Sequence, residues 1–67
     1  MARLNTRGKV RWQSAGALVN LRKAENHLLQ IAGIADGRSD YINDNLPQIV
    51  TSLHFIIETM EKFDEGL

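Results

Sequence analysis

Hydrophobic residues recur at alternating spacings of four and three in two long segments of the chain. In the first segment Ser14 fills the one polar slot, and the apolar positions are Val10, Ala17, Leu21, Ala24, Leu28, Ile31 and Ala35. In the second segment every slot is apolar, at Ile42, Leu46, Ile49, Leu53, Ile56, Met60, Phe63 and Leu67. This spacing keeps the apolar side chains on one face of an α-helix. The pattern predicts two amphipathic helices, over residues 9–35 and 40–65.

A short polar segment, ADGRSD, separates the two predicted helices. Asp36-Gly37 suits a helix C-terminus, where glycine adopts the left-handed conformation, and Ser39 or Asp40 can cap the next helix. A loop this short joins antiparallel neighbours. The sequence therefore predicts an all-α helical hairpin, a single domain over 1–67 with its turn at 36–39. Residues 1–8 are expected to form a flexible basic arm.

Pro47 interrupts the second predicted helix. Proline removes one backbone hydrogen bond and clashes with the preceding helical turn. The helix is therefore either kinked near Pro47 or begins near Asn45, with the proline in its first turn. Because Ile42 and Leu46 stay in phase with the later apolar residues, the pattern favours one kinked helix.

The apolar face is wider than one hairpin needs, because Leu18 and Ala32 flank the seam in the first helix, as do Val50 and Ile57 in the second. A face three positions wide is typical of a bundle of more than two helices. A chain of 67 residues without cysteine has a small core and no disulfides, which leaves oligomerisation as a source of stability. We therefore expect a homodimer that forms a four-helix bundle. Its expected interface consists of Leu18, Leu21, Leu28, Ile31, Leu46, Ile49, Val50, Leu53, Ile56, Ile57 and Met60.

The formal net charge of zero conceals an uneven distribution of charge. Residues 1–24 carry six cations and no acid, whereas residues 25–67 carry eight acids and two cations. In an antiparallel hairpin, residue 10 is expected beside residues 64–66, which would bring Arg7, Lys9 and Arg11 level with the acids of 58–65. Trp12 adjoins these cations and is expected to cover the open end of the bundle near Phe63, to anchor a partner, or to stack on a nucleic-acid base.

The sequence contains no recognisable set of catalytic residues. Cysteine is absent, His27 and His54 are expected too far apart to share a metal ion, and GxSxG, Walker and Rossmann patterns are missing. We expect no enzymatic activity, cofactor, metal ion or small-molecule substrate. No apolar segment approaches the roughly 18 residues of a membrane helix, and no secretory signal is recognisable, so the expected location is cytoplasmic, without membrane contact.

Apolar and aromatic residues off the main seam indicate contact with another molecule. The partner-binding candidates are Trp12, Val19, Leu29 and Phe55. We therefore expect a non-catalytic protein–protein interaction module, such as an adaptor, inhibitor or assembly subunit, that acts as a homo-oligomer. Its expected partners are a second copy of the chain and another protein.

The alternative is a small dimeric regulator that binds RNA or DNA. The outer side of the first helix carries basic and amide side chains that can contact a phosphate backbone, at Arg11, Arg22, Lys23, Asn26 and Gln30. A dimerised hairpin of this length also resembles the Rop-type RNA-binding regulators in overall plan, although no motif is shared. The zero net charge disfavours this alternative, because domains of this kind are usually basic.

Overall fold

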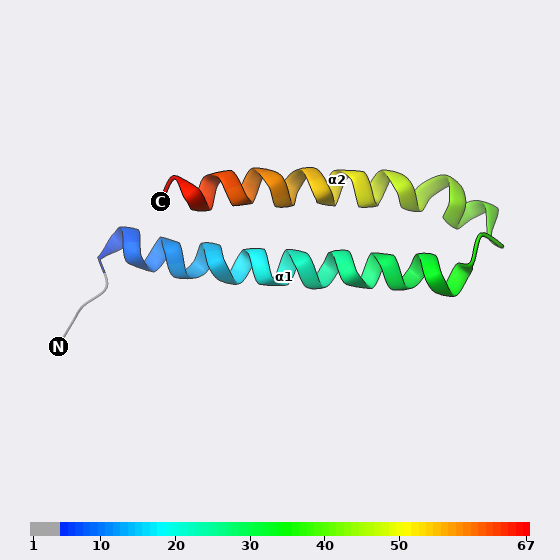
Figure 1. The fold of residues 1–67 in the computed structure, drawn as a ribbon, viewed down its shortest axis with the longest axis horizontal. Helices are drawn as coiled ribbons and strands as arrows, with labels where there is room; N and C mark the ends of the chain where they lie inside the picture. The colour runs from blue at the N-terminus through cyan, green and yellow to red at the C-terminus, as the bar shows by residue number, and fades with distance from the viewer. Residues whose placement is uncertain (1–4) are drawn as a thin grey trace.

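The computed structural model describes residues 5–67 and shows two helices that lie side by side in antiparallel orientation. Helix α1 covers Thr6–Ala35, and helix α2 covers Asp40–Glu65. Figure 1 shows the two helices following each other along most of their length, joined by a short loop at one end. The residues from 5 to 67 contain no β-strand. The predicted all-α helical hairpin is confirmed.

Side-chain caps fix where both helices begin. The side chain of Asn5 accepts a hydrogen bond from the Gly8 N–H at 2.6 Å, and α1 begins at Thr6. Residues 6–8 are therefore helical rather than part of a flexible arm, and residues 1–4 of that expected arm lie outside the described residues. At the start of α2, Ser39 Oγ accepts a hydrogen bond from the Ile42 N–H at 3.2 Å, as expected for an N-cap.

Two consecutive residues in the left-handed conformation reverse the chain between the helices. Asp36 has a φ of 50° and Gly37 a φ of 71°. The Asp36 N–H donates to the Ala32 carbonyl at 3.0 Å and closes α1. Glycine at position 37 avoids the steric cost of a side chain at positive φ. The Asn43 side chain donates to the Gly37 carbonyl at 3.0 Å, which ties the loop to α2.

Helix α2 is continuous through Pro47, which lies inside it. Figure 1 shows that the first turns of α2 bend toward α1, away from the line of the rest of the helix. Because proline has no N–H, the backbone hydrogen bond that would tie it to the preceding turn is missing. Within the bent segment, the Asn45 side chain donates to the Tyr41 carbonyl at 2.7 Å. The structure thus has one bent helix rather than a helix that begins near Asn45.

The alignment of the two helices differs from the expected one by about one helical turn. The expected pairing of residue 10 with residues 64–66 would place His54 level with about residue 21, but the His54 Nδ1 atom lies 3.6 Å from a Glu25 carboxylate oxygen. Likewise, Arg11 donates a hydrogen bond to the carbonyl of Leu67. The shift arises because the chain reverses across the whole loop 36–39 and the bent start of α2, rather than at residue 37 alone.

The core of a single hairpin is very small. Within residues 5–67, the buried hydrophobic side chains are Leu18 and Ile57, which are 9% and 5% exposed. Neighbouring side chains between the helices, such as Leu21 and Leu53, are only half-buried. The hairpin alone therefore removes few of its apolar side chains from water.

The residues of α2 that face α1 are not the ones predicted from the main apolar repeat of the sequence. Ile49 and Ile56 belong to that repeat but are 51% and 47% exposed. Ile57 was expected at its flank but is buried, and Val50 is half-buried. Successive residues are about 100° apart around a helix. The row of Val50 and Ile57 therefore faces α1, and the row of Ile49 and Ile56 lies to one side.

Ser14 is a buried polar residue whose hydroxyl has no hydrogen-bond partner within the described part of the chain. An unsatisfied buried hydroxyl costs about 1–3 kcal/mol. We expect Ser14→Ala to raise the free energy of unfolding by about 1 kcal/mol or more, as measured by urea denaturation followed by circular dichroism. Asn20→Ala, at an exposed position of α1, is the control for helix propensity. Equal gains in both variants would contradict a cost of burying the hydroxyl.

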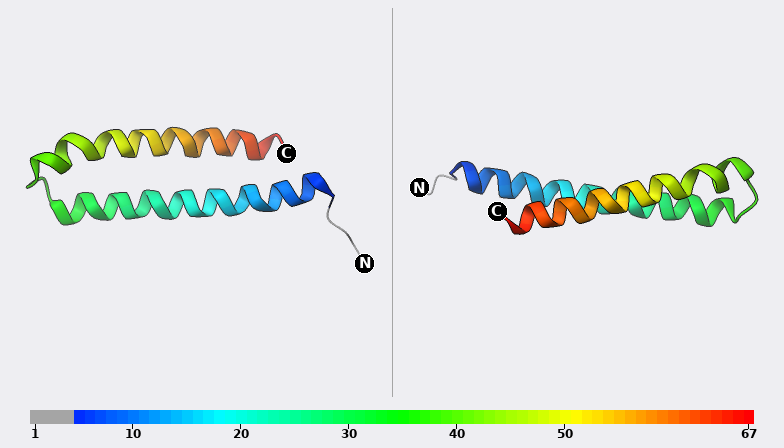
Figure 2. Two further views of the ribbon diagram at one scale, coloured as in Figure 1. Left: turned by 180° about the vertical axis from the view of Figure 1, so that it is seen from behind. Right: turned by 90° about the horizontal axis from the view of Figure 1, so that it is seen from above.

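The hairpin is elongated, with extents of 56 × 20 × 12 Å. Figure 2 shows from above that its helices form a single layer and cross at a shallow angle. The Cα radius of gyration is 16.2 Å, against about 11 Å for a compact domain of this length. The accessible surface of 5593 Å² exceeds by about 1,300 Å² that of a compact monomer of the same mass. Residues 1–4 can account for at most about 500 Å² of this excess. At least about 800 Å² of excess surface therefore belongs to the rest of the chain.

Candidate interaction surfaces

One side of the hairpin is apolar and uncharged. A groove between the helices on this side is lined by Ala24, His27, Leu28, Ile49, Ser52, Leu53 and Ile56. One heptad further along each helix, the same rows reach Ile31 on α1 and Phe63 on α2, which are 41% and 51% exposed. We call these nine residues the apolar side. They include no Lys, Arg, Asp or Glu, so this surface offers hydrophobic contact without charge.

A cluster of charged side chains bridges the two helices elsewhere on the hairpin. Arg22 of α1 lies 3.8 Å from a carboxylate oxygen of Glu61 on α2. The His54 ring of α2 lies between two carboxylates, with Nδ1 3.6 Å from Glu25 and Nε2 3.1 Å from Glu58. In its protonated form the imidazole can donate a hydrogen bond to each of them. We call these five residues the charged side.

Several residues of the charged side and the apolar side lie on opposite faces of their helices. Residues two positions apart are about 200° apart around a helix, as are Arg22 and Ala24 on α1 and His54 and Ile56 on α2. Most of the charged side chains are largely exposed, and exposed ion pairs contribute only about 0–1 kcal/mol each. The hairpin is therefore amphipathic as a whole, with one side suited to contact and the other to solvent.

The ion pairs at the open end of the hairpin differ from those expected. Within residues 5–67, neither Arg7 nor Lys9 lies at ion-pair distance from an acid. Arg11 contacts a backbone carbonyl, that of Leu67, and Arg22 makes the contact with the acidic end of α2. The reason is the alignment of the helices, since Figure 1 shows the first turn of α1 extending past the end of α2.

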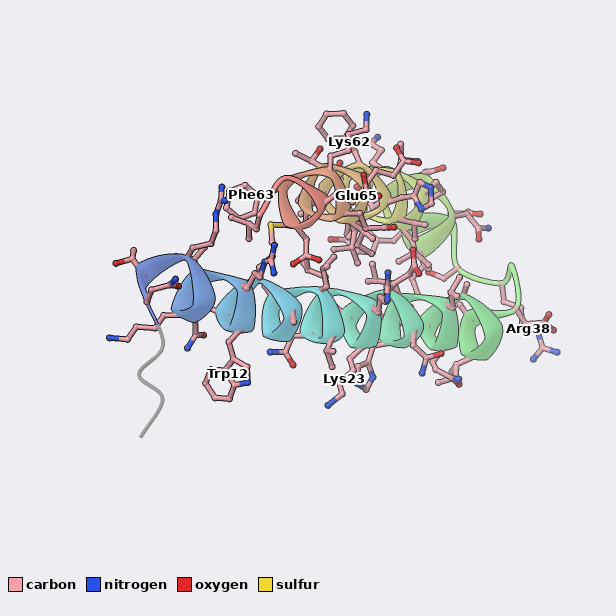
Figure 3. The ribbon with its side chains drawn as sticks, turned by 60° about the vertical axis from the view of Figure 1, so that its left-hand side comes forward. Trp12, Lys23, Arg38, Lys62, Phe63 and Glu65 are labelled. Carbon is pink, nitrogen blue, oxygen red and sulfur yellow. The ribbon has the colours of Figure 1, made fainter. Side chains whose placement is uncertain are left out.

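Trp12 and Val19 border a shallow groove on the outer face of α1. The groove is also lined by Gln13, Ala15 and Gly16. Trp12 is 72% exposed and Val19 is 53% exposed. Figure 3 shows Trp12 projecting from the side of α1 that faces away from α2. Trp12 therefore does not cover the end of the hairpin near Phe63, which was one of the three expectations for it.

The other two partner-binding candidates lie on separate surfaces. Leu29 is 57% exposed and lies about 15 Å along α1 from Val19. Phe55 is 68% exposed and belongs to α2. The structure thus brings Trp12 and Val19 together, but the four candidates do not form one surface.

The candidate nucleic-acid contacts do not form a uniformly basic patch. Arg22 pairs with Glu61, and Arg11 contacts the Leu67 carbonyl. Lys23 projects away from α2, as Figure 3 shows, and Asn26 and Gln30 are exposed. Because Glu61 and its acidic neighbours adjoin the arginine, a phosphate backbone along this face would meet carboxylates as well as cations.

The residues expected at the oligomer interface differ in how deeply they are buried within a single hairpin. Leu18 and Ile57 are buried inside the hairpin, and three residues are exposed on the apolar side: Ile31, Ile49 and Ile56. The others are half-buried between the helices: Leu21, Leu28, Leu46, Val50, Leu53 and Met60. Their part in an interface between copies stays a prediction.

The groove beside Trp12 was not predicted from the sequence, because a glycine inside a helix by itself indicates only a lower helix propensity. In the structure, a Cβ atom at position 16 would meet no side chain beyond its chain neighbours and no other part of the chain within 4 Å. The signal that could have revealed the groove is spacing. Trp12, Gly16 and Val19 follow one another at intervals of four and three, which places them on one face of α1.

Within the described range, no group of three or more His, Asp or Glu side chains is placed to hold a metal ion. Neither of the two helices is sufficiently long and apolar to cross a membrane. No protein-family model matches the chain, and comparisons with curated proteins and with solved structures found no significant match.

Proposed function

We propose that this protein is a non-catalytic helical interaction module that acts as a homo-oligomer. The observation that carries the proposal is the apolar side, an uncharged surface next to a core in which Leu18 and Ile57 are the buried hydrophobic side chains of residues 5–67. Large exposed apolar surfaces on small proteins mark contact sites. The apolar side is thus the surface through which one hairpin binds a second copy, before the module engages another protein as an adaptor, inhibitor or assembly subunit.

The excess surface of the hairpin has the size that a stable dimer needs. A standard protein–protein interface buries about 800 Å² on each partner. The hairpin of 5593 Å² exposes at least about that much more than a compact chain of the same mass. Covering the apolar side with a second copy would therefore give each chain the burial that it lacks alone.

Two hairpins related by a two-fold axis would bury the apolar side and leave the charged side in solvent. Their apolar sides would meet and form the interior of a four-helix bundle, and their charged sides would remain in solvent. Small residues such as Ala24 on α1 lie beside large ones such as Ile49 and Ile56 on α2. Alternation of small and large side chains allows facing layers to interdigitate.

The test is the coupling of mass to helix content. In size-exclusion chromatography with light scattering, we expect twice the chain mass of 7.6 kDa at a protein concentration of about 100 µM. On dilution, the helix signal in circular dichroism should fall together with the mass, because a lone hairpin has little core. A fully helical monomer at the higher concentration would contradict self-association.

A further inference from the structure

A second surface lies along the outer face of α1. Lys9, Trp12, Gly16, Val19 and Lys23 follow one another at intervals of three, four, three and four, so they form one stripe along the helix. All five residues are exposed. Figure 3 shows that Trp12 and Lys23 project away from α2. The stripe is therefore accessible in the hairpin, and its centre from Trp12 to Val19 precedes the apolar side along α1.

The middle of the stripe is shaped to receive a bulky apolar side chain. Trp12 and Val19 stand at the two ends of the groove, about 10 Å apart along the helix axis. Gly16 forms its floor, with open space where a Cβ atom would project. A hole between larger side chains on a helix is the feature that accepts a knob from a neighbouring helix.

The ends of the stripe are cationic. Lys9 and Lys23 lie seven residues before and after Gly16, or about 10 Å along α1 in each direction. Within residues 5–67, neither lysine is paired with an acid of its own chain. The first acid of α1 is Glu25, beyond the stripe. An occupant with carboxylates at both ends would complement these charges.

We propose that this stripe binds an acidic amphipathic helix of a partner protein. The partner places a bulky apolar residue over Gly16, between Trp12 and Val19, and carboxylates about two turns to either side contact Lys9 and Lys23. The proposal rests on the proposed interaction role but not on self-association, because the stripe shares no residue with the apolar side.

A second copy of this chain fits the stripe poorly. Phe55 and Tyr41 are large exposed residues of α2 that could occupy the groove, and Tyr41 has no carboxylate seven residues to either side of it. Lys62 lies seven residues after Phe55. With Phe55 over Gly16, Lys62 would therefore meet Lys9 in one orientation of the helix and Lys23 in the other. The like charges disfavour both orientations.

Trp12 provides a direct readout because it is the one tryptophan of the chain. The probe is a synthetic, end-capped helical peptide of about five turns, with leucine at its centre and glutamates seven residues to either side. We expect the peptide to shift Trp12 emission to the blue as the indole leaves water. A matched peptide with lysines in place of the glutamates should bind at least about tenfold more weakly.

Two glycine variants form a matched pair that tests the groove. Gly16→Leu fills the groove, and Gly33→Leu changes an equally open position of α1 outside the stripe. Calorimetry should show at least about tenfold weaker peptide binding for Gly16→Leu and wild-type binding for Gly33→Leu. Circular dichroism and light scattering of both variants should show a folded protein of unchanged mass.

Several outcomes would overturn the proposal. These are equal affinity for the acidic and basic peptides, equal losses in the two glycine variants, or no binding of the acidic peptide. A blue shift with phosphatidylserine vesicles or duplex RNA, but not with the acidic peptide, would assign the stripe to a membrane surface or a nucleic acid instead. A monomer that binds the acidic peptide would refute self-association and support this site, whereas a dimer that does not bind it would do the reverse.

Discussion

Replacing Ile57 with aspartate is expected to unfold the hairpin. The Ile57 side chain is 5% exposed and is one of two buried hydrophobic residues in the described structure. A charged or unsatisfied carboxyl group at this position costs several kcal/mol. A domain of this size has only a few kcal/mol of net stability, so the loss should exceed the total. Circular dichroism should show loss of the helix signal at 25 °C, even at high protein concentration.

Thr51→Asp is the matched control, because it introduces the same side chain at an exposed position of α2. Its effect on stability should stay within about 0.5 kcal/mol. If Ile57→Asp kept its helix content and urea midpoint, Ile57 could not lie in the core.

Replacing Ile56 with aspartate is expected to dissociate the oligomer. Ile56 is 47% exposed in the single hairpin and lines the groove of the apolar side. In a two-fold dimer each substitution occurs twice, and a desolvated carboxylate at each site should cost about 2 kcal/mol or more. Self-association should therefore weaken by at least about a hundredfold. Light scattering at micromolar concentration should give the mass of one chain.

Phe55→Asp is the control for a general effect of adding a negative charge to α2. Phe55 adjoins Ile56 in sequence and is 68% exposed, but it lies about 100° away around the helix. The Phe55 variant should retain the mass of the wild-type oligomer. Equal dissociation of the two variants would show that the apolar side is not the interface.

The two helices and their turn could be predicted from the sequence because each depends on local signals. The spacing of apolar residues defines a helix whatever it packs against. The Asp36-Gly37 turn and the Ser39 cap depend on backbone geometry close in sequence, and the structure shows both. Local rules therefore determined the secondary structure and the fold class.

The rotation of α2 could not be predicted in the same way. Ile49 and Val50 are adjacent apolar residues, as are Ile56 and Ile57, and either member of each pair fits a helical seam. The choice between them depends on the fit against α1, which the pattern of one helix does not contain. The same applies to the ion pairs, since the contact between Arg22 and Glu61 depends on the alignment of two helices across the loop.

Among the candidate sites, the exposure of Trp12 and Val19 followed from their positions off the seam, whereas the groove between them did not. A glycine in a helix lowers helix propensity by up to about 1 kcal/mol, and this cost is visible in any sequence. The open space over Gly16 can be recognised as a groove only when the structure shows that Trp12 and Val19 are exposed on either side of it.

Under the proposed self-association, the small core of the hairpin would also link the amount of this protein in a cell to its survival there. Because residues 5–67 bury two hydrophobic side chains, a hairpin that associates as proposed would gain most of its stability from association, which depends on concentration. At low abundance most copies would be unfolded and open to cellular proteases, whereas above a threshold they would protect one another. Proteolysis would then remove copies synthesised at a low rate and spare those made in a burst. The amount of folded protein would thereby stay low at low rates of synthesis and rise steeply once the rate passed a threshold.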